Sequence, residues 1–342
     1  MVTIGIIGFG YWGPNLVRNF TRLPQARVGW ICDLDTKLLL AASRLYPGTK
    51  TTTNYREILS DDRVTAVVIA TPPSTHFSLG KAALAAGKHV LIEKPLTIAA
   101  SDAKQLIALA RRKKKILMVD HTYVYTPAVA TIGQILKKGE LGSLLSIDSV
   151  RTNLGIIQND VNILYDLACH DFSIIDYLLG TTPTSISAIG TNHRMLRQDT
   201  SAYITAQYPL PAGRQGKNVF VHVHVSWLTP VKIRRMMIIG TKKMLVYDDN
   251  ESSEKLKIYD RGISISAEAP NTYQQRIGYR TGNIVSPFIP MAEGLVAMTS
   301  AFVEAIISGT PPPTSGECGF RVVKILESAT LALHSKKKMI YL

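Results

Sequence analysis

A glycine-rich segment near the start of the sequence carries the clearest chemical signal. Gly8, Gly10 and Gly13 form a G-x-G-x-x-G pattern between the apolar run Thr3–Ile7 and a helical stretch. In such a pattern the first glycine permits a tight turn, the second lets the backbone approach a pyrophosphate, and the third allows close helix–strand packing. The N–H groups at the start of the helix then face the phosphates. The pattern in this context predicts a dinucleotide-binding turn, and the alternative is a purely structural glycine turn.

An acidic pair follows the next apolar run. Asp33 and Asp35 come at the end of Val28–Cys32, about 20 residues after the glycines. A carboxylate at the position of Asp33 accepts hydrogen bonds from the ribose hydroxyls of NAD. The 2′-phosphate of NADP would instead meet two like charges with no arginine directly beside them. The sequence therefore favours NAD over NADP.

A lysine and a helical Asp–His pair are the candidates for catalysis. Lys94 comes just after the apolar run His89–Ile92, between Glu93 and Pro95. Ligands bind at the carboxyl ends of parallel strands, so we expect its ammonium to point toward the nicotinamide position. Asp166 and His170 are four residues apart in a helical pattern and share one face. From the residues alone, His170 could equally be a helix histidine packed at a domain interface.

Alternating strands and helices are expected to position these residues. Helical patterns such as Ser74–Ala86 and Ser101–Lys113 separate the early apolar runs, which predicts a parallel sheet covered on both faces. The expected strands are Thr3–Ile7, Val28–Cys32, Ala66–Ala70, His89–Ile92 and Ile116–Val119.

After about Tyr125 the pattern changes. A helix is expected over Ala128–Lys138 and a longer one over Val161–Leu179, and strand patterns then follow one another without helices between them. Consecutive strands of this kind predict a largely antiparallel sheet. The expected strands are Ser185–Gly190, Ala202–Tyr208, Lys217–Trp227, Lys232–Ile239, Lys243–Tyr247 and Lys255–Tyr259, with closing helices near Met291–Ile307 and over Gly316–His334.

The fold class that we predict is therefore α/β with two domains. Residues 1–123 should form a Rossmann dinucleotide-binding domain. Residues 124–342 should form a substrate-binding and oligomerisation domain of α+β type, with a large, open, mostly antiparallel sheet. The segment 209–216 is expected to be a hairpin loop, and its part 213–216 has no assigned role.

The composition excludes several other classes of protein. The 342 residues are 46% hydrophobic and 19% charged, which is typical of a globular chain and not of a disordered one. No apolar run is long enough for a membrane helix. Three scattered cysteines fit a reducing cytoplasm and form no zinc-ligand spacing, so we expect no metal. The net charge of +14 lies partly in the runs 111–115 and 336–338, which lack aromatic stacking residues and favour solvated faces over nucleic-acid binding.

The sequence resembles a known enzyme family at several motifs. The segment TPPSTH (71–76) followed by AGKHVLIEKP (86–95), after an N-terminal G-x-G-x-x-G, is similar to the Gfo/Idh/MocA oxidoreductases. Their Glu-Lys-Pro signature is matched by residues 93–95, and a D-x-x-x-H pattern is matched by residues 166–170. The resemblance covers nearly the whole chain. Departures include Ala168-Cys169 in place of a usual Gly-Pro, and Thr126 in place of a common Asn.

The resemblance implies roles for particular residues. It makes Lys94 and His170 catalytic, with Asp166 as the helix acid near the substrate. The expected cofactor site comprises Gly8, Gly10, Tyr11, Trp12, Gly13, Asp33, Leu34, Thr71, Pro72, His76, Glu93 and Lys94. The expected substrate site comprises Lys94, Tyr125, Arg151, Asn153, Asn162, Asp166 and His170.

A sugar substrate follows from the same resemblance. Segments 10–20, 121–129, 151–155 and 224–249 are similar to family members that act at C3 of UDP-N-acetylglucosamine or its uronate. The chain is thus expected to transfer a hydride between a sugar carbon and NAD. The alternatives are another sugar or polyol dehydrogenase, a ketosugar reductase, or a non-catalytic NAD-binding regulator. The sugar, the direction of reaction and the route of NADH reoxidation are not encoded in these motifs.

One strand pattern bears on assembly. His222 and His224 alternate with valines and share a face with Phe220 and Ser226. A metal between the two histidines would lack an evident third ligand. Family members commonly associate through this sheet face, so the resemblance implies a homodimer or homotetramer. The expected partners are a small sugar or nucleotide sugar and further copies of the chain, with no nucleic acid and no membrane.

Overall fold

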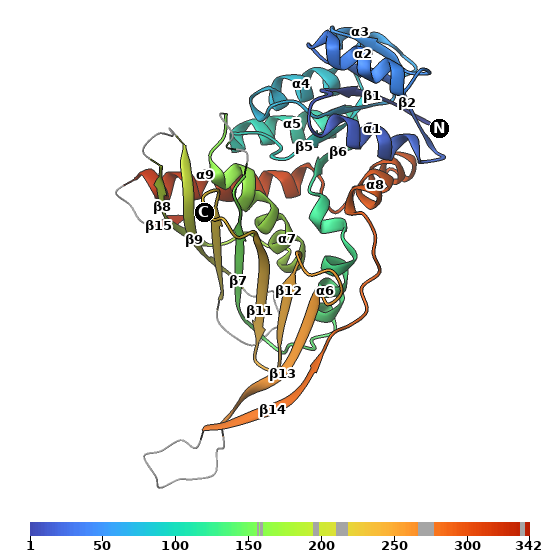
Figure 1. The fold of residues 1–342 in the computed structure, drawn as a ribbon. Helices are drawn as coiled ribbons and strands as arrows, with labels where there is room; N and C mark the ends of the chain where they lie inside the picture. The colour runs from blue at the N-terminus through green and yellow to red at the C-terminus, as the bar shows by residue number, and fades with distance from the viewer. Residues whose placement is uncertain (156, 158–159, 194–197, 210–217, 266–276, 336–338) are drawn as a thin grey trace. The chain divides into compact units, whose positions relative to one another are not determined.

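The computed structural model describes the chain except for residues 156, 158–159, 194–197, 210–217, 266–276 and 336–338 (Figure 1). The expected hairpin loop 209–216, with its part 213–216, thus lies almost wholly outside the described residues. The chain forms two compact units. The first comprises residues 1–126, 158–177 and 292–327, and the second comprises residues 127–157, 178–291 and 328–342.

The first unit is built on a six-stranded parallel sheet. The strand order is β3-β2-β1-β4-β5-β6, and every neighbouring pair is parallel. From β1, the strands β2 and β3 extend the sheet to one side, and β4, β5 and β6 extend it to the other. The topological switch point therefore lies between β1 and β4. The strands are β1 (Val2–Ile7), β2 (Ala26–Cys32), β3 (Lys50–Thr52), β4 (Ala66–Ile69), β5 (His89–Glu93) and β6 (Leu117–Asp120).

Helices and two apolar clusters cover both faces of this sheet. On one face, Ile4 and Ile6 pack with the edge-to-face pair Phe20–Phe302, whose ring centroids are 6.3 Å apart. On the other face, Ile69 and Ile92 belong to a second buried cluster. Strands buried on both faces are near-continuous apolar runs, as the sequence indicated. The helices are α1 (Gly13–Thr21), α2 (Thr36–Leu45), α3 (Tyr55–Ser60), α4 (Pro73–Ala85), α5 (Ala100–Lys113), α8 (Gly294–Ser308) and the first part of α9 (Gly316–His334).

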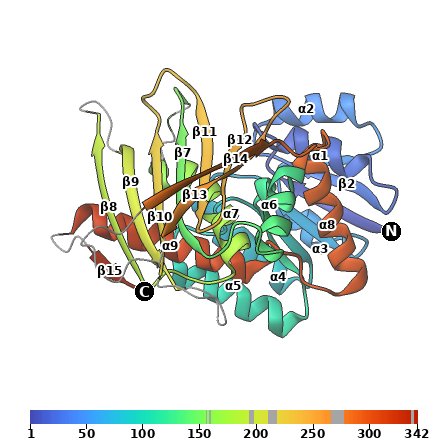
Figure 2. The same cartoon turned by 90° about the horizontal axis from the view of Figure 1, so that it is seen from below.

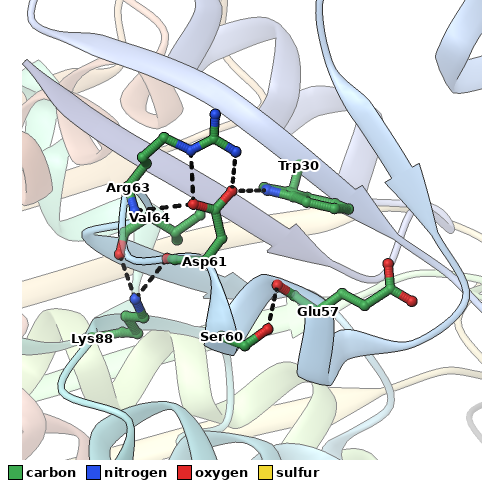
Figure 3. Close-up of polar contacts among 7 residues, drawn as sticks. All are labelled: Trp30, Glu57, Ser60, Asp61, Arg63, Val64 and Lys88. Atoms are coloured by element: carbon green, nitrogen blue, oxygen red, sulfur yellow. Dashed lines mark hydrogen bonds and ion pairs between the residues drawn. The ribbon is translucent and has the colours of Figure 1, made fainter.

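Polar contacts around Asp61 stabilise the turn that leads into β4 (Figure 3). The carboxylate of Asp61 accepts hydrogen bonds from the indole N–H of Trp30 at 2.9 Å and from the guanidinium of Arg63 at 2.7 Å and 2.9 Å. The ammonium of Lys88, which is 5% exposed, donates to the carbonyls of Asp61 and Val64 at 2.9 Å and 2.8 Å. These charges lie at the amino ends of the strands, so they stabilise the fold at the edge opposite to the glycine turn.

The second unit contains a nine-stranded sheet (Figure 2). Its order is β14-β13-β12-β11-β7-β10-β9-β8-β15, and β7 with β10 is its parallel pair, while the other neighbours run antiparallel. The mostly antiparallel sheet confirms the predicted fold class. The elements are α6 (Pro127–Lys137), β7 (Leu144–Thr152), β8 (Ser185–Asn192), β9 (Asp199–Tyr208), β10 (Val219–Ser226), β11 (Ile233–Gly240), β12 (Met244–Asp248), β13 (Leu256–Ile265), β14 (Ile277–Val285) and β15 (Met339–Tyr341).

The predicted helix Val161–Leu179 needs a correction. The helical segment begins at Ile163, forms a π-helical turn, η2 (Leu164–Ala168), and continues as the α-helix α7 (Cys169–Leu179). The side-chain oxygen of Asn162 accepts the N–H groups of Leu164 and Tyr165 at 3.1 Å and 3.3 Å. This cap fixes the start of the helical segment at residue 163 rather than at residue 161.

Candidate functional site

The glycines of the turn between β1 and α1 differ in how much space surrounds them. Gly8 has φ of +100°, and a side chain there would collide with the carbonyl of Ala70. A side chain on Gly13 would collide with the carbonyl of Gly8. No heavy atom of the described chain lies within 4 Å of a Cβ placed on Gly10. The fold therefore requires Gly8 and Gly13, whereas the packing of the described chain does not require a glycine at position 10.

The acid at the end of β2 ties this turn together. Asp33 accepts the N–H of Phe9 at 2.6 Å through one carboxylate oxygen and the N–H of Asp35 at 2.9 Å through the other. Each carboxylate oxygen has a second lone pair for a ribose hydroxyl. The first turn of α1 contains no acidic residue that would repel a phosphate. Around the turn, Tyr11, Trp12 and Leu34 are exposed apolar side chains. These residues fit NAD.

His76 joins two loops at the same edge of the sheet. Its Nε2 lies 2.8 Å from the carbonyl of Thr71, directly after β4, and its Nδ1 lies 2.7 Å from the carbonyl of Pro95, after β5. The side chain is fully buried, and burial lowers its pKa. Pro72, the residue before α4, is exposed at this edge. The structure thus gives His76 contacts that fix the loop carrying Lys94.

Lys94 is held as a cation beside β5. Its ammonium donates to both the carboxylate and the carbonyl oxygen of Asp166, each at 2.9 Å. Burial opposes the charge, yet the pKa of Lys94 is raised, because the acidic groups of Cys169, Asp166 and Glu93 favour the protonated form. Lys94 can therefore donate hydrogen bonds and stabilise negative charge, but it does not serve as a base near neutral pH.

The π-helical turn brings the second half of the site to Lys94. Asp166 lies in η2, and His170 follows in the first turn of α7. The ring of Tyr123 meets the imidazole of His170 edge-on, with centroids 4.9 Å apart. Tyr123 belongs to the short 3-10 helix η1 (Thr122–Tyr125) after β6. The first unit therefore contains Lys94, Asp166 and His170 together with the glycine turn.

Sequence reasoning missed two residues at the end of β6. Asp120 ends β6 and His121 follows it, just as Glu93 ends β5 and Lys94 follows it. Asp120 and His121 are both buried. Burial, and secondarily Lys94, lower the pKa of His121 to about 3, so its ring is neutral. In the described chain neither ring nitrogen of His121 has a hydrogen-bond partner. The signal that could have found them is the polar dipeptide directly after the strand Leu117–Val119.

The remaining expected substrate residues have the following positions. The hydroxyl of Tyr125 lies 3.0 Å from that of Thr314, and burial raises the pKa of Tyr125 to about 12. Asn162 is the helix cap described above. Arg151 is buried at the end of β7 in the second unit, and Asn153 donates its N–H to a strand carbonyl there at 3.0 Å.

The described residues contain neither a metal-binding cluster nor a membrane-spanning helix. No group of three His, Cys, Asp or Glu side chains is arranged to hold a metal ion. His222 instead lies 3.1 Å from the hydroxyl of Thr205, and His224 stacks on Tyr203. Of the helices in the described part, none is both long and apolar enough to cross a membrane.

Two family models match successive segments of the chain. Residues 2–121 match the oxidoreductase family with an NAD-binding Rossmann fold, and residues 129–246 match the GFO/IDH/MocA C-terminal domain. The chain belongs to the Gfo/Idh/MocA oxidoreductase family. It is an NAD-binding oxidoreductase, as its glycine turn and Asp33 indicate.

Three proteins illustrate what the chain is similar to. The chain is 26% identical to UDP-N-acetylglucosamine 3-dehydrogenase of Acidithiobacillus ferrooxidans, over 93% of both proteins. It is also 26% identical to the oxidoreductase YrbE of Bacillus subtilis, over 55% of this chain and 57% of that protein, so this match spans little more than half of YrbE. A levoglucosan dehydrogenase structure with NADH and levoglucosan has the same fold, with a TM-score of 0.82, 19% identity and 99% coverage of both chains.

Proposed function

We propose that this oxidoreductase oxidises a secondary hydroxyl of a sugar, at C3 of a UDP-N-acetylhexosamine or its uronate. The observation that carries the proposal is Lys94, which Asp166 holds as a partly buried cation in the same unit as the NAD-binding turn. A fixed cation of this kind suits a reaction in which negative charge develops on oxygen. The 3-dehydrogenase that matches over 93% of the chain supports the nucleotide sugar as substrate.

The cofactor would be held by the glycine turn, Asp33 and the start of α1. When bound, NAD supplies the nicotinamide carbon that accepts the hydride. Lys94 donates a hydrogen bond to the substrate hydroxyl and stabilises its developing negative charge. His170 accepts the hydroxyl proton, because imidazole has an ordinary pKa suited to a base near neutral pH. The alcohol loses one proton and one hydride and becomes a ketone.

Asp166 orients Lys94 in this mechanism. Its carboxylate and carbonyl oxygens fix two of the three ammonium hydrogens, so the third can point to a substrate oxygen. Tyr123 supports the imidazole of His170 from one edge. We assign substrate hydroxyl and phosphate contacts to Arg151, Asn153, Asn162 and Tyr125. The net charge of +14 would also concentrate an anionic nucleotide sugar near the surface.

A second candidate is a dehydrogenase of free sugars or polyols, or a ketosugar reductase. The levoglucosan dehydrogenase structure, with a TM-score of 0.82, favours this candidate, because its sugar carries no nucleotide. A non-catalytic NAD-binding regulator is disfavoured, since Lys94, Asp166 and His170 are all retained.

We also propose a homo-oligomer in a reducing, cytoplasmic setting. The exposed face of β9 and β10 carries Tyr203 and Phe220, which are 56% and 46% exposed, and a second copy would cover them. The three cysteines are buried free thiols, which fits a reducing compartment.

NADH absorbance tests the proposal directly. Purified protein and NAD are mixed with UDP-N-acetylhexosamines, their uronates, free sugars and inositol, with and without 2-oxoglutarate. A signal with a UDP-sugar that is lost in Lys94→Ala, but kept in the surface control Lys104→Ala, would support the proposal. A signal with free sugars alone would support the second candidate. Tight NAD binding without a signal in either direction would support the regulator.

A further inference from the structure

Two carboxyl groups lie next to each other at the ends of neighbouring strands. Glu93 ends β5 and Asp120 ends β6, and the two are partners in the parallel register. Their exposed fractions are 8% and 4%. Each of the two carboxyl groups influences the pKa of the other. Ionised carboxylates only accept hydrogen bonds, so two neighbouring carboxyl groups can bond to each other only when one of them holds a proton.

The surroundings of the pair agree with one bound proton. Thr122 donates its hydroxyl to Asp120. Oε1 of Glu93 is buried and receives no hydrogen bond from an N–H or O–H group of the described residues. Burial raises the pKa of both carboxyl groups. A proton shared with Asp120 satisfies the pair without any further donor from the chain.

The charges around the pair also limit its ionisation. Lys94 is the cation beside Glu93, and it already forms an ion pair with Asp166. Two further full negative charges would leave a buried excess that a single ammonium cannot balance. The other titratable groups near the pair and Lys94 are His76 from α4, His121 and Tyr125 after β6, and Cys169 from α7.

We propose that Glu93 and Asp120 are a positioning pair that holds one proton and one negative charge beside Lys94. The single charge helps to keep Lys94 protonated, while the shared proton prevents the pair from competing with Asp166 for the ammonium. Neither carboxyl group needs to touch substrate for this role. Its importance for turnover rests on the proposed function, whereas the proton and the charge can be measured without activity.

Infrared spectroscopy of the full chain tests whether one of the two carboxyl groups is protonated. Near pH 7 the unsubstituted protein should show the C=O band of a buried protonated carboxyl group. Both Glu93→Gln and Asp120→Asn should lose this band, because an amide N–H replaces the shared proton and the remaining carboxyl group ionises. The exposed Glu304, in α8, provides the control, and Glu304→Gln should keep the band. Absence of the band from the unsubstituted protein, or its survival in either single variant, would overturn the proposal.

Competitive acetylation of lysines measures the effect on Lys94. Mass spectrometry compares the reactivity of Lys94 with that of the exposed Lys104 in the same sample. Each single amide variant retains one negative charge, so the reactivity of Lys94 should stay within about twofold. The double variant Glu93→Gln/Asp120→Asn removes that charge, and the reactivity should rise about tenfold for each pKa unit lost by Lys94.

Two acetylation patterns would contradict the proposal that the pair holds one proton and one negative charge. Equal stepwise increases in the single and double variants would mean that each carboxylate carries its own charge. No increase in the double variant would mean that Lys94 does not depend on the pair. Both results are independent of whether the chain oxidises a sugar, so failure of this inference and failure of the proposed function are distinguishable.

Discussion

Burial of His121 should make the protein more sensitive to acid in a defined pH window. The pKa of this imidazole falls from 6.5 to about 3 in the folded chain, because burial and Lys94 disfavour its charge. A lowered pKa means that the folded state binds fewer protons than the unfolded state. The contribution of His121 is therefore fully present above the unfolded pKa and is lost as the pH falls from 6.5 toward about 3.

The size of the effect follows from the two pKa values. At about pH 7 the unfolded imidazole is mostly neutral, so almost none of the stability present at higher pH has been lost. At about pH 5 protonation of the unfolded imidazole costs about 2 kcal/mol of folding free energy. His121→Leu removes this group without leaving an unpaired polar atom, so the variant should lose about 2 kcal/mol less stability than the parent between these two pH values.

Urea unfolding followed by circular dichroism measures this difference. The parent, His121→Leu and the control His193→Leu, at an exposed histidine of the second unit, are compared at about pH 5 and about pH 7. The control should follow the parent. An unchanged pH dependence in His121→Leu would refute the reasoning, because it would mean that His121 can be protonated in the folded chain.

Three further predictions concern the cofactor, the catalytic cation and the assembly. Gly10→Ala should fold like Gly48→Ala, since both side chains meet open space, but calorimetry should show NAD affinity lowered about tenfold or more in Gly10→Ala alone. Lys94→Ala should lower turnover about 100-fold or more while NAD affinity changes less than about threefold, and equal losses in both would place Lys94 in cofactor binding instead. Phe220→Glu should reduce the mass seen by light scattering to one chain, whereas Leu40→Glu on α2 should not, and a monomeric parent would contradict the assembly.

The sequence was sufficient to predict the elements that carry strong periodic signals. The apolar runs before Gly8 and Lys94 became β1 and β5, because strands buried on both faces are apolar throughout. The short edge strands β3 and β15 were missed, since three residues carry almost no periodic signal. The π-helical turn at Asp166 was also missed, because a pattern of four-residue spacing does not distinguish it from an α-helix.

The site could be predicted only in part, because it depends on contacts between residues that are far apart in the sequence. The spacing of Asp166 and His170 indicated a shared face, but not that Asp166 would bind Lys94, which is 72 residues away. The partnership of Glu93 with Asp120 depends on the register of β5 and β6, which neither strand encodes by itself. The assigned roles of the cofactor and substrate residues remain predictions until binding is measured.

Isotope transfer is the most direct test of the central claim. UDP-N-acetylglucosamine carrying deuterium at C3 is incubated with the protein and NAD, and mass spectrometry analyses the reduced cofactor. We predict deuterated NADH, a slower turnover than with unlabelled sugar, and neither product with Lys94→Ala. Unlabelled NADH formed together with an oxidised sugar would contradict hydride transfer from C3.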